Sequence, residues 1–327
     1  MELTHIAIAG RILAPRRLLL PDFVPVRDPN DLAVQALVWY PVNRTVTSTS
    51  VDLAERQNYE HPLATYLNSM SPDLDFKRFF TWFREREDIE NEHRLQQDPD
   101  HRDRQLEAVR RAISQLVPGF KGDTLRVKRT PQNQLLIVKG DTTFSIDQLS
   151  DGEKCLIALI GDLARRLAIA DPFIADPLEA TGIVLLDEIE LHLHPAWQRA
   201  VLNHLPRTFP GCQFIITTHS PTVLTEVPPD RLLLLTPTET DGIQVRRPEA
   251  AYGMDVTRAL EDLMGVPGRP SAIEEELKQL AAVLGAQPPD FTAARLLLDD
   301  LEARLGGDDP TLVRSRAYLQ TRELLKR

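Results

Sequence analysis

The chain has 327 residues, of which 42% are hydrophobic and 26% are charged, an ordinary composition for a globular protein of about two domains. Its formal net charge of -10 excludes a protein whose whole surface coats nucleic acid or an anionic membrane, although a local basic patch stays possible. The two cysteines, Cys155 and Cys212, lie in apolar segments, which is typical of a reducing compartment and predicts a cytoplasmic location.

The N-terminal segment, residues 1–33, stays without a structural prediction because prolines interrupt it and no helical or strand period is sustained. It begins MELTHIAIAGRILAPRR, where an acid at position 2 and Arg11 within the apolar run argue against a signal peptide or a membrane span. We therefore expect no association with a membrane.

The sequence pattern over residues 34–250 predicts an α/β core. The stretch VQALVWYPVNR, residues 34–44, indicates a buried strand that stops at Pro41. From about residue 60 to residue 118, apolar residues recur at helical spacing among many charges, which predicts a helical insertion. Three short strands then follow in TLRVKR, QLLIVK and TFSI, before the loop DQLSDGE.

The second half of this core alternates apolar helices and strands. Helices are predicted at 154–170 and 195–205, and strands at 182–187, 212–218 and 231–237. Such alternation is typical of a parallel sheet with helices packed on it.

Residues 251–327 show a wholly helical pattern, so we expect a helical C-terminal domain. Ser271 followed by Glu274 predicts a capping box, and Asp309 before Pro310 predicts the cap of a last helix.

Polar residues follow two of the predicted strands directly. Asp187 and Glu188 follow GIVLL, and His219 follows CQFIITT. Because the carboxyl ends of parallel strands meet at one edge of a sheet, these three side chains are expected to lie together. An acidic pair after an apolar strand has the Walker B arrangement, in which Asp187 would hold Mg²⁺ and Glu188 would polarise the attacking water. Alternatively, Asp187 only caps a turn and His219 is structural.

The stretch LSDGEK, residues 149–154, offers a hydroxyl, a glycine amide and a helix N-terminus, all of which favour a phosphate group. Ser150 and Glu153 also fit an ordinary capping box, and that structural alternative is the better one when the stretch is taken alone.

A zinc site is a further alternative, because His192 and His194 lie within eight residues of Asp187, Glu188 and Glu190. Zinc sites usually include cysteine or a well-separated third ligand, so this interpretation carries low weight.

In this order, LSDGEK, IVLLDE, LHLHP and TTHSP resemble the second half of the ABC-type ATPases of the SMC, RecF and OLD branch. The likeness extends over about residues 34–327 and is strongest to ATP-binding proteins of bacterial anti-phage and virulence-associated loci. LSDGEK departs from the LSGGQ of transporters, since Asp151 replaces the first glycine and Glu153 the glutamine.

The resemblance implies ATP and Mg²⁺ as cofactors and a homo- or heterodimer that forms through the nucleotide face. It also implies a nuclease or another effector as a further partner, whereas the net charge gives no indication of nucleic acid. It implies Mg²⁺ at Asp187, water activation at Glu188 and a γ-phosphate contact at His219. The residues expected to face the nucleotide of a partner subunit are Ser150, Asp151, Gly152 and Glu153. A Gly152→Asp chain is then expected to keep its melting temperature and to lose ATP-dependent association.

The motif GxxxxGKS/T, whose amides and lysine gather the phosphates, does not occur in the 327 residues. The expected fold is therefore a P-loop NTPase-like, ABC-ATPase core that lacks its P-loop segment. Three explanations stay open: a truncated or alternatively started ATPase, a natural subunit that pairs with a competent partner, and a protein that has lost turnover. The expected function is a nucleotide-driven switch in anti-phage defence or DNA maintenance, and the alternative is a non-catalytic scaffold or regulatory subunit.

Overall fold

The computed structural model describes residues 5–10, 33–44, 61–71, 76–129, 134–238, 242–287 and 290–325. The chain divides into two compact units, Met1–Ala259 and Leu260–Arg327.

Two sheets organise the first unit. A six-stranded sheet has the order β2-β6-β7-β1-β8-β9, and a three-stranded sheet has the order β3-β4-β5. The strands are β1 (His5–Gly10), β2 (Ala36–Tyr40), β3 (Phe120–Lys128), β4 (Gln134–Lys139), β5 (Thr142–Ser145), β6 (Gly182–Leu186), β7 (Cys212–Thr218), β8 (Leu232–Pro237) and β9 (Ile243–Arg246).

Among the described residues, five helices lie between these strands along the chain, and a sixth, α6, follows β9. They are α1 (Lys77–Gln96), α2 (Arg104–Leu116), α3 (Asp151–Ala170), α4 (Pro195–Thr208), α5 (Pro221–Leu224) and α6 (Val256–Asp262). Single 3₁₀ turns are η1 (Pro62–Tyr66), η2 (Ile146–Gln148), η3 (Pro177–Glu179) and η4 (Pro229–Arg231).

The strands β2, β6 and β7 are parallel to one another, so the predicted α/β class with a parallel sheet is confirmed. The N-terminal segment, for which the sequence supported no structural prediction, contributes a strand: His5–Gly10 lies in the middle of this sheet. This strand, β1, runs antiparallel to both β7 and β8. The six residues HIAIAG are almost continuously apolar, and such a short run cannot be told from a buried helix segment by its period, so this strand was not predicted.

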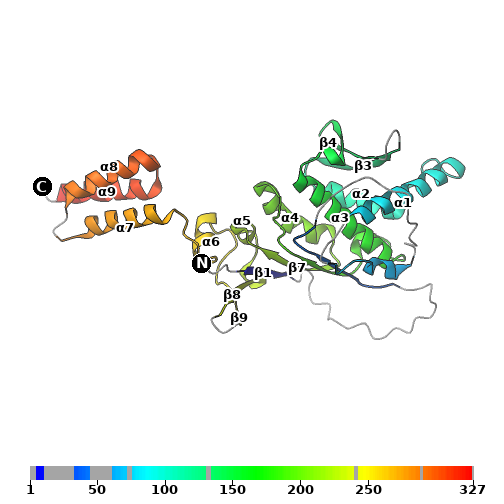
Figure 1. Cartoon of the computed structure of the whole chain (residues 1–327), viewed down its shortest axis with the longest axis horizontal. Coiled ribbons are helices and arrows are strands. Elements are labelled where there is room, and N and C mark those ends of the chain that lie inside the picture. The colour runs from blue at the N-terminus through cyan, green and yellow to red at the C-terminus, as the bar shows by residue number, and fades with distance from the viewer. Residues whose placement is uncertain are drawn as a thin grey trace. The chain divides into compact units, whose positions relative to one another are not determined.

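Helix α3 is the most enclosed element of the first unit, because nearly all of its residues are buried. Leu167 of α3 lies against Gly182 of β6, beside Ala36 and Cys212 from the two neighbouring strands. Helix α2 packs on α3, and β3 packs on α2 (Figure 1). Along β6 and β7, fully buried residues alternate with half-buried ones, as expected for strands with one face against a helix layer.

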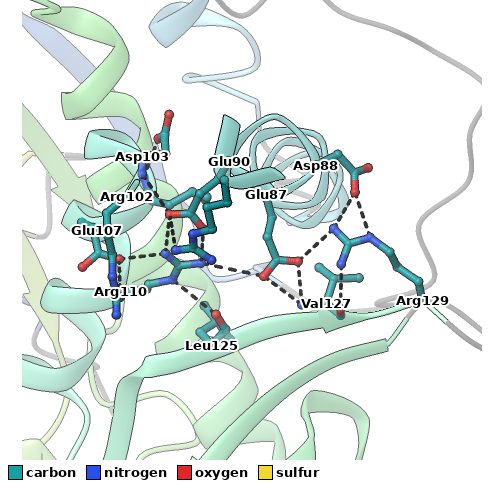
Figure 2. A network of polar contacts seen from close by, with 12 residues as sticks. Glu87, Asp88, Glu90, Arg102, Asp103, Glu107, Arg110, Leu125, Val127 and Arg129 are labelled. Carbon is teal, nitrogen blue, oxygen red and sulfur yellow. Dashed lines mark hydrogen bonds and ion pairs between the residues drawn. The ribbon is translucent and has the colours of Figure 1, made fainter. Parts of the chain in front are cut away.

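A buried network of charges joins α1, α2 and β3 (Figure 2). Nη1 and Nη2 of Arg110 lie 3.0 and 3.1 Å from the carboxylate oxygens of Glu90, and Nη1 lies 2.7 Å from Glu107. Glu87 accepts a hydrogen bond of 3.0 Å from the backbone N–H of Val127. Burial raises the pKa of Glu87. Burial would also raise the pKa of Glu90, but the hydrogen bonds from Arg110 and a backbone N–H outweigh it and lower that pKa. The network ties the helical insertion to the smaller sheet.

A second buried cluster lies between β2 and α3. Asp162 accepts hydrogen bonds from Tyr40 Oη at 3.0 Å, from Arg165 Nη2 at 2.6 Å and from Arg166 Nε at 2.6 Å. Burial would raise the pKa of Asp162, but the two guanidinium groups lower it to about 2. Burial raises the pKa of Tyr40, and the neighbouring Asp162 carboxylate raises it further. All four side chains are buried, so the cluster is an internal ion pair and not a surface one.

The second unit is a helical bundle of α7 (Ser271–Gly285), α8 (Phe291–Leu305) and α9 (Pro310–Leu325). Leucines from all three helices form its core, among them Leu280, Leu298 and Leu312. The predicted cap at Asp309 is confirmed, because its carboxylate accepts from the Thr311 N–H at 2.9 Å. The predicted capping box at Ser271 is wrong: Pro270 is the residue before α7, and no side chain caps this helix.

In the parts of the chain that the structure describes, no helix is both long enough and apolar enough to cross a bilayer.

Candidate functional site

The two strand ends that carry the acidic pair and the histidine lie side by side, because β6 and β7 are parallel neighbours. Asp187 and Glu188 follow β6 and His219 follows β7. Nε2 of His219 lies 3.9 Å from Oε1 of Glu188, and about a third of each side chain is exposed. The structure therefore brings together the three residues that the strand pattern grouped, at an edge that solvent can reach.

Two hydrogen bonds orient the carboxylate of Asp187. Trp39, from the neighbouring strand β2, donates its indole N–H to Oδ2 at 2.8 Å. Thr217 donates its hydroxyl to Oδ1 at 3.3 Å. A half-buried carboxylate held in one orientation suits Mg²⁺, which prefers oxygen ligands and usually keeps several of its water molecules.

The backbone at Glu188 has an unusual conformation, with φ of +44° in the left-handed region. Such a conformation of a non-glycine residue costs of the order of 1 kcal/mol or more and persists only where the surroundings enforce it. Here the Glu188 N–H donates to Thr217 Oγ1 at 2.9 Å, and the Glu188 carbonyl accepts from Arg44 Nη2 at 2.6 Å. Arg44 also donates to the carbonyls of Asp187 and Pro41. The buried Arg44 guanidinium thus holds the turn that presents Glu188.

The stretch LSDGEK begins α3, and the structure shows the capping box that was the alternative reading. The Ser150 backbone N–H and hydroxyl each lie 2.9 Å from Oε2 of Glu153, and the Glu153 N–H donates back to Ser150 Oγ at 3.4 Å. Helix α3 starts at Asp151, three residues before the predicted start at Lys154. Ser150 and Asp151 are exposed, whereas Gly152 and Glu153 are buried.

Glu153 has a second partner in the same chain, because Lys139 of β4 forms an ion pair with its carboxylate. Burial would raise the pKa of Glu153, but the hydrogen bonds from Lys139 and Ser150 outweigh it and lower that pKa. The Glu153 carboxylate is therefore an internal anchor of the loop, and a contact of Ser150 or Asp151 with a nucleotide stays a prediction.

Gly152 is packed against the loop that follows Glu188. A Cβ atom at position 152 would lie 2.1 Å from the carbonyl oxygen of His192, far inside contact distance. His192 itself has φ of +62°. The lack of a side chain at Gly152 is thus required within this chain, whatever it also does toward a partner.

The zinc alternative finds no support in the structure. His194 Nδ1 accepts from the Ala196 N–H at 3.2 Å, so His194 is the N-cap of α4. Across the described ranges, no group of three or more His, Cys, Asp and Glu side chains is arranged to hold a metal ion.

Sequence patterns missed several residues that shape the site, namely Trp39, Arg44, Glu190 and Thr217. Trp39 and Arg44 flank Pro41 at the end of β2. Because the ends of parallel strands meet at one edge of a sheet, these two residues could have been grouped with Asp187 and His219. Glu190 was considered only as part of a zinc site, and nothing in its spacing signals a contact with β7.

The α/β fold, with an acidic strand end beside a histidine, is the arrangement expected of an ABC-type ATPase domain. Residues 40–225 match the family described as "AAA domain, putative AbiEii toxin, Type IV TA system", and the chain belongs to this family.

Among curated relatives, the chain is 33% identical over 253 residues to the "Retron Vc95 probable ATPase" of Vibrio cholerae serotype O1 biovar El Tor, covering 64% of this chain and 48% of that protein. It is 36% identical over 219 residues to the "Retron Ec83 probable ATPase" of Escherichia coli, covering 66% of this chain and 39% of that protein. It is 26% identical over 249 residues to the Septu protein PtuA of Bacillus thuringiensis, covering 72% of this chain and 59% of that protein. The chain thus spans about half or less of the length of the two retron proteins. A solved SMC ATPase structure aligns at 21% identity with a TM-score of 0.34, over 49% of this chain and 91% of that one.

Proposed function

We propose that the chain is a nucleotide-driven switch that binds and hydrolyses ATP, acting in bacterial anti-phage defence. The observation that carries this proposal is the convergence of Asp187, Glu188 and His219 on adjacent parallel strands, with Asp187 and Glu188 held by hydrogen bonds. Its retron and Septu relatives support the defence setting. Two buried free cysteines agree with the cytoplasmic location that we propose.

In this proposal Asp187 would hold Mg²⁺ through water molecules of the ion's solvation shell. The ion would neutralise charge on the ATP phosphates. Glu188 orients and polarises the attacking water, and His219 contacts the γ-phosphate. Ser150 and Asp151, which are exposed at the start of α3, face the nucleotide of a partner subunit. The buried Gly152 and Glu153 stabilise the backbone that carries Ser150 and Asp151. The functional unit in this proposal is a homo- or heterodimer.

The first prediction concerns the chain alone. Because its sequence contains no GxxxxGKS/T, it is expected to bind Mg²⁺-ATP weakly and to release phosphate near the background rate. Isothermal titration calorimetry and a phosphate-release assay measure both. Micromolar affinity with sustained turnover by the pure chain would contradict the prediction.

The second prediction separates the two acids in the complex formed by an extended form of this chain that carries a P-loop, because the P-loop and the acidic pair of one site belong to the same polypeptide. Glu188→Gln is expected to keep Mg²⁺-ATP binding and to lose most turnover, since the amide keeps the shape and the backbone contacts but polarises water poorly. Asp187→Asn is expected to weaken Mg²⁺-ATP binding itself. Binding is measured with a fluorescent ATP analogue and turnover by phosphate release, each on that complex. Equal loss of binding in both variants would show that the roles are not divided in this way.

A second candidate function is a non-catalytic scaffold or regulatory subunit paired with a competent ATPase. The capping box at Ser150 favours it, because the signature stretch has a sufficient structural reason to exist. ATP-dependent association with a P-loop-bearing partner, measured by size-exclusion chromatography with light scattering, distinguishes the two. A scaffold associates equally with and without ATP.

A further inference from the structure

The loop from Glu188 to His194 is tied to the end of β7 by the carboxylate of Glu190. Oε2 of Glu190 accepts a 2.6 Å hydrogen bond from the hydroxyl of Thr218, and Oε1 accepts a 2.5 Å hydrogen bond from the backbone N–H of His219. One carboxylate therefore bridges two consecutive residues, and it does so with short bonds of the charge-assisted kind.

The hydrogen bond to the His219 N–H fixes the position of the His219 backbone, and so the point from which the imidazole extends. The imidazole then stands 3.9 Å from Glu188, whose own backbone is held in the left-handed region by Thr217 and Arg44. Both partners of the pair are thus placed by neighbours that take no part in the pair. Displacements of about 1 Å in such a constellation are enough to cost large factors in rate.

A second bridge joins the same two segments farther along, and it provides a comparison. Gln198 of α4 accepts from the Ser220 hydroxyl at 2.8 Å and donates to the Leu193 carbonyl at 3.0 Å. This bridge links the loop to Ser220, the residue after His219, so its loss perturbs the loop while the His219 N–H stays bonded to Glu190.

We propose that Glu190 is a positioning residue, whose carboxylate sets the place of the His219 imidazole relative to the carboxylate of Glu188. Its importance for catalysis rests on the proposed ATPase function, whereas the positioning itself does not. The loop that carries Glu190 also carries His192, whose carbonyl packs on Gly152 at the start of α3. A change at the surface of α3 that would face a partner can therefore reach His219 through this one loop.

The test uses the full chain labelled with ¹⁵N-histidine, whose eight histidines give a small set of backbone amide signals. His219→Gln identifies the His219 signal by its disappearance. In Glu190→Ala the His219 amide is expected to move upfield and to exchange with solvent at least tenfold faster, because it loses its acceptor. Glu190→Gln keeps one carbonyl oxygen and is expected to restore part of the protection. Gln198→Ala is expected to leave the His219 amide unchanged.

An unshifted, protected His219 amide in Glu190→Ala would overturn the proposal, as would an equal shift in Gln198→Ala. Should Glu190→Ala fail to fold, as judged by circular dichroism, Glu190→Asp shortens the side chain by one methylene and serves as the test variant. A second measurement is turnover in the complex formed by an extended form of this chain that carries a P-loop, where Glu190→Ala is expected to lower kcat about tenfold at unchanged Mg²⁺-ATP affinity. If the parent complex shows no turnover, the proposed ATPase function fails, while the amide signals still decide whether Glu190 positions His219.

Discussion

Replacing Asp162 by alanine is expected to lower the free energy of unfolding by about 3–5 kcal/mol, the largest effect of a single substitution that we predict. The reason is that Arg165 and Arg166 would keep their charges in a buried site without the carboxylate that balances them. Tyr40 would also lose the acceptor for its hydroxyl. Urea unfolding followed by circular dichroism measures the change.

A matched control is Asp141→Ala, which removes an aspartate from the exposed ion pair with Lys121. Exposed pairs contribute little, so this variant is expected to unfold like the parent chain. If the two aspartate variants have the same stability, the buried cluster does not contribute as the structure indicates.

The same cluster has a defined pH dependence. The pKa of Asp162 is lowered from 3.8 to about 2 in the folded chain, so its contribution is fully present above about pH 4. It is lost as the pH falls from about 4 toward 2, and it amounts to about 2 kcal/mol. The parent chain is therefore expected to lose stability in this window by more than Asp162→Asn does, a difference that unfolding curves at several pH values detect.

Gly152→Ala is expected to destabilise the core unit by about 1–3 kcal/mol, the usual range for an overpacked site. The added Cβ would lie 2.1 Å from the His192 carbonyl oxygen and 3.0 Å from its carbon, and backbone atoms in a hydrogen-bonded loop cannot easily give way. The larger aspartate side chain should cost more. The structure therefore predicts a lower melting temperature for Gly152→Asp as well, whereas the expectation from the sequence, which considered only the approach of a partner's phosphate, was an unchanged one.

The comparison for Gly152 is Gly285→Ala, at the end of α7, where an added Cβ meets no atom within 4 Å. This variant is expected to unfold at the parent temperature, or slightly above it because alanine favours helix. A Gly152→Ala chain that melts like Gly285→Ala would show that the loop at His192 yields without cost.

Features set by a local pattern could be predicted from the sequence. The apolar runs before Asp187 and His219 determine two buried parallel strands, and that topology alone places their ends together. That Arg44 and Trp39 lie near the same edge of the sheet could have been inferred from the end of β2. Their hydrogen bonds to Asp187 could not be predicted, because these bonds join residues 143 and 148 positions apart in the chain. The packing of Gly152 within the chain was not predicted for a similar reason, since the carbonyl that it accommodates lies in a distant loop.

The place of β1 in the middle of the larger sheet has a consequence for how the protein is made. Strands β7 and β8 each pair with His5–Gly10 and are joined only through it. On the ribosome, β1 therefore emerges long before its two partners, so the sheet cannot close while most of the core unit is being synthesised. At typical elongation rates this delay is roughly ten to forty seconds, during which the exposed edges of β7 and β1 would be open to chaperones. The core unit should consequently complete its folding only after β8 has left the exit tunnel.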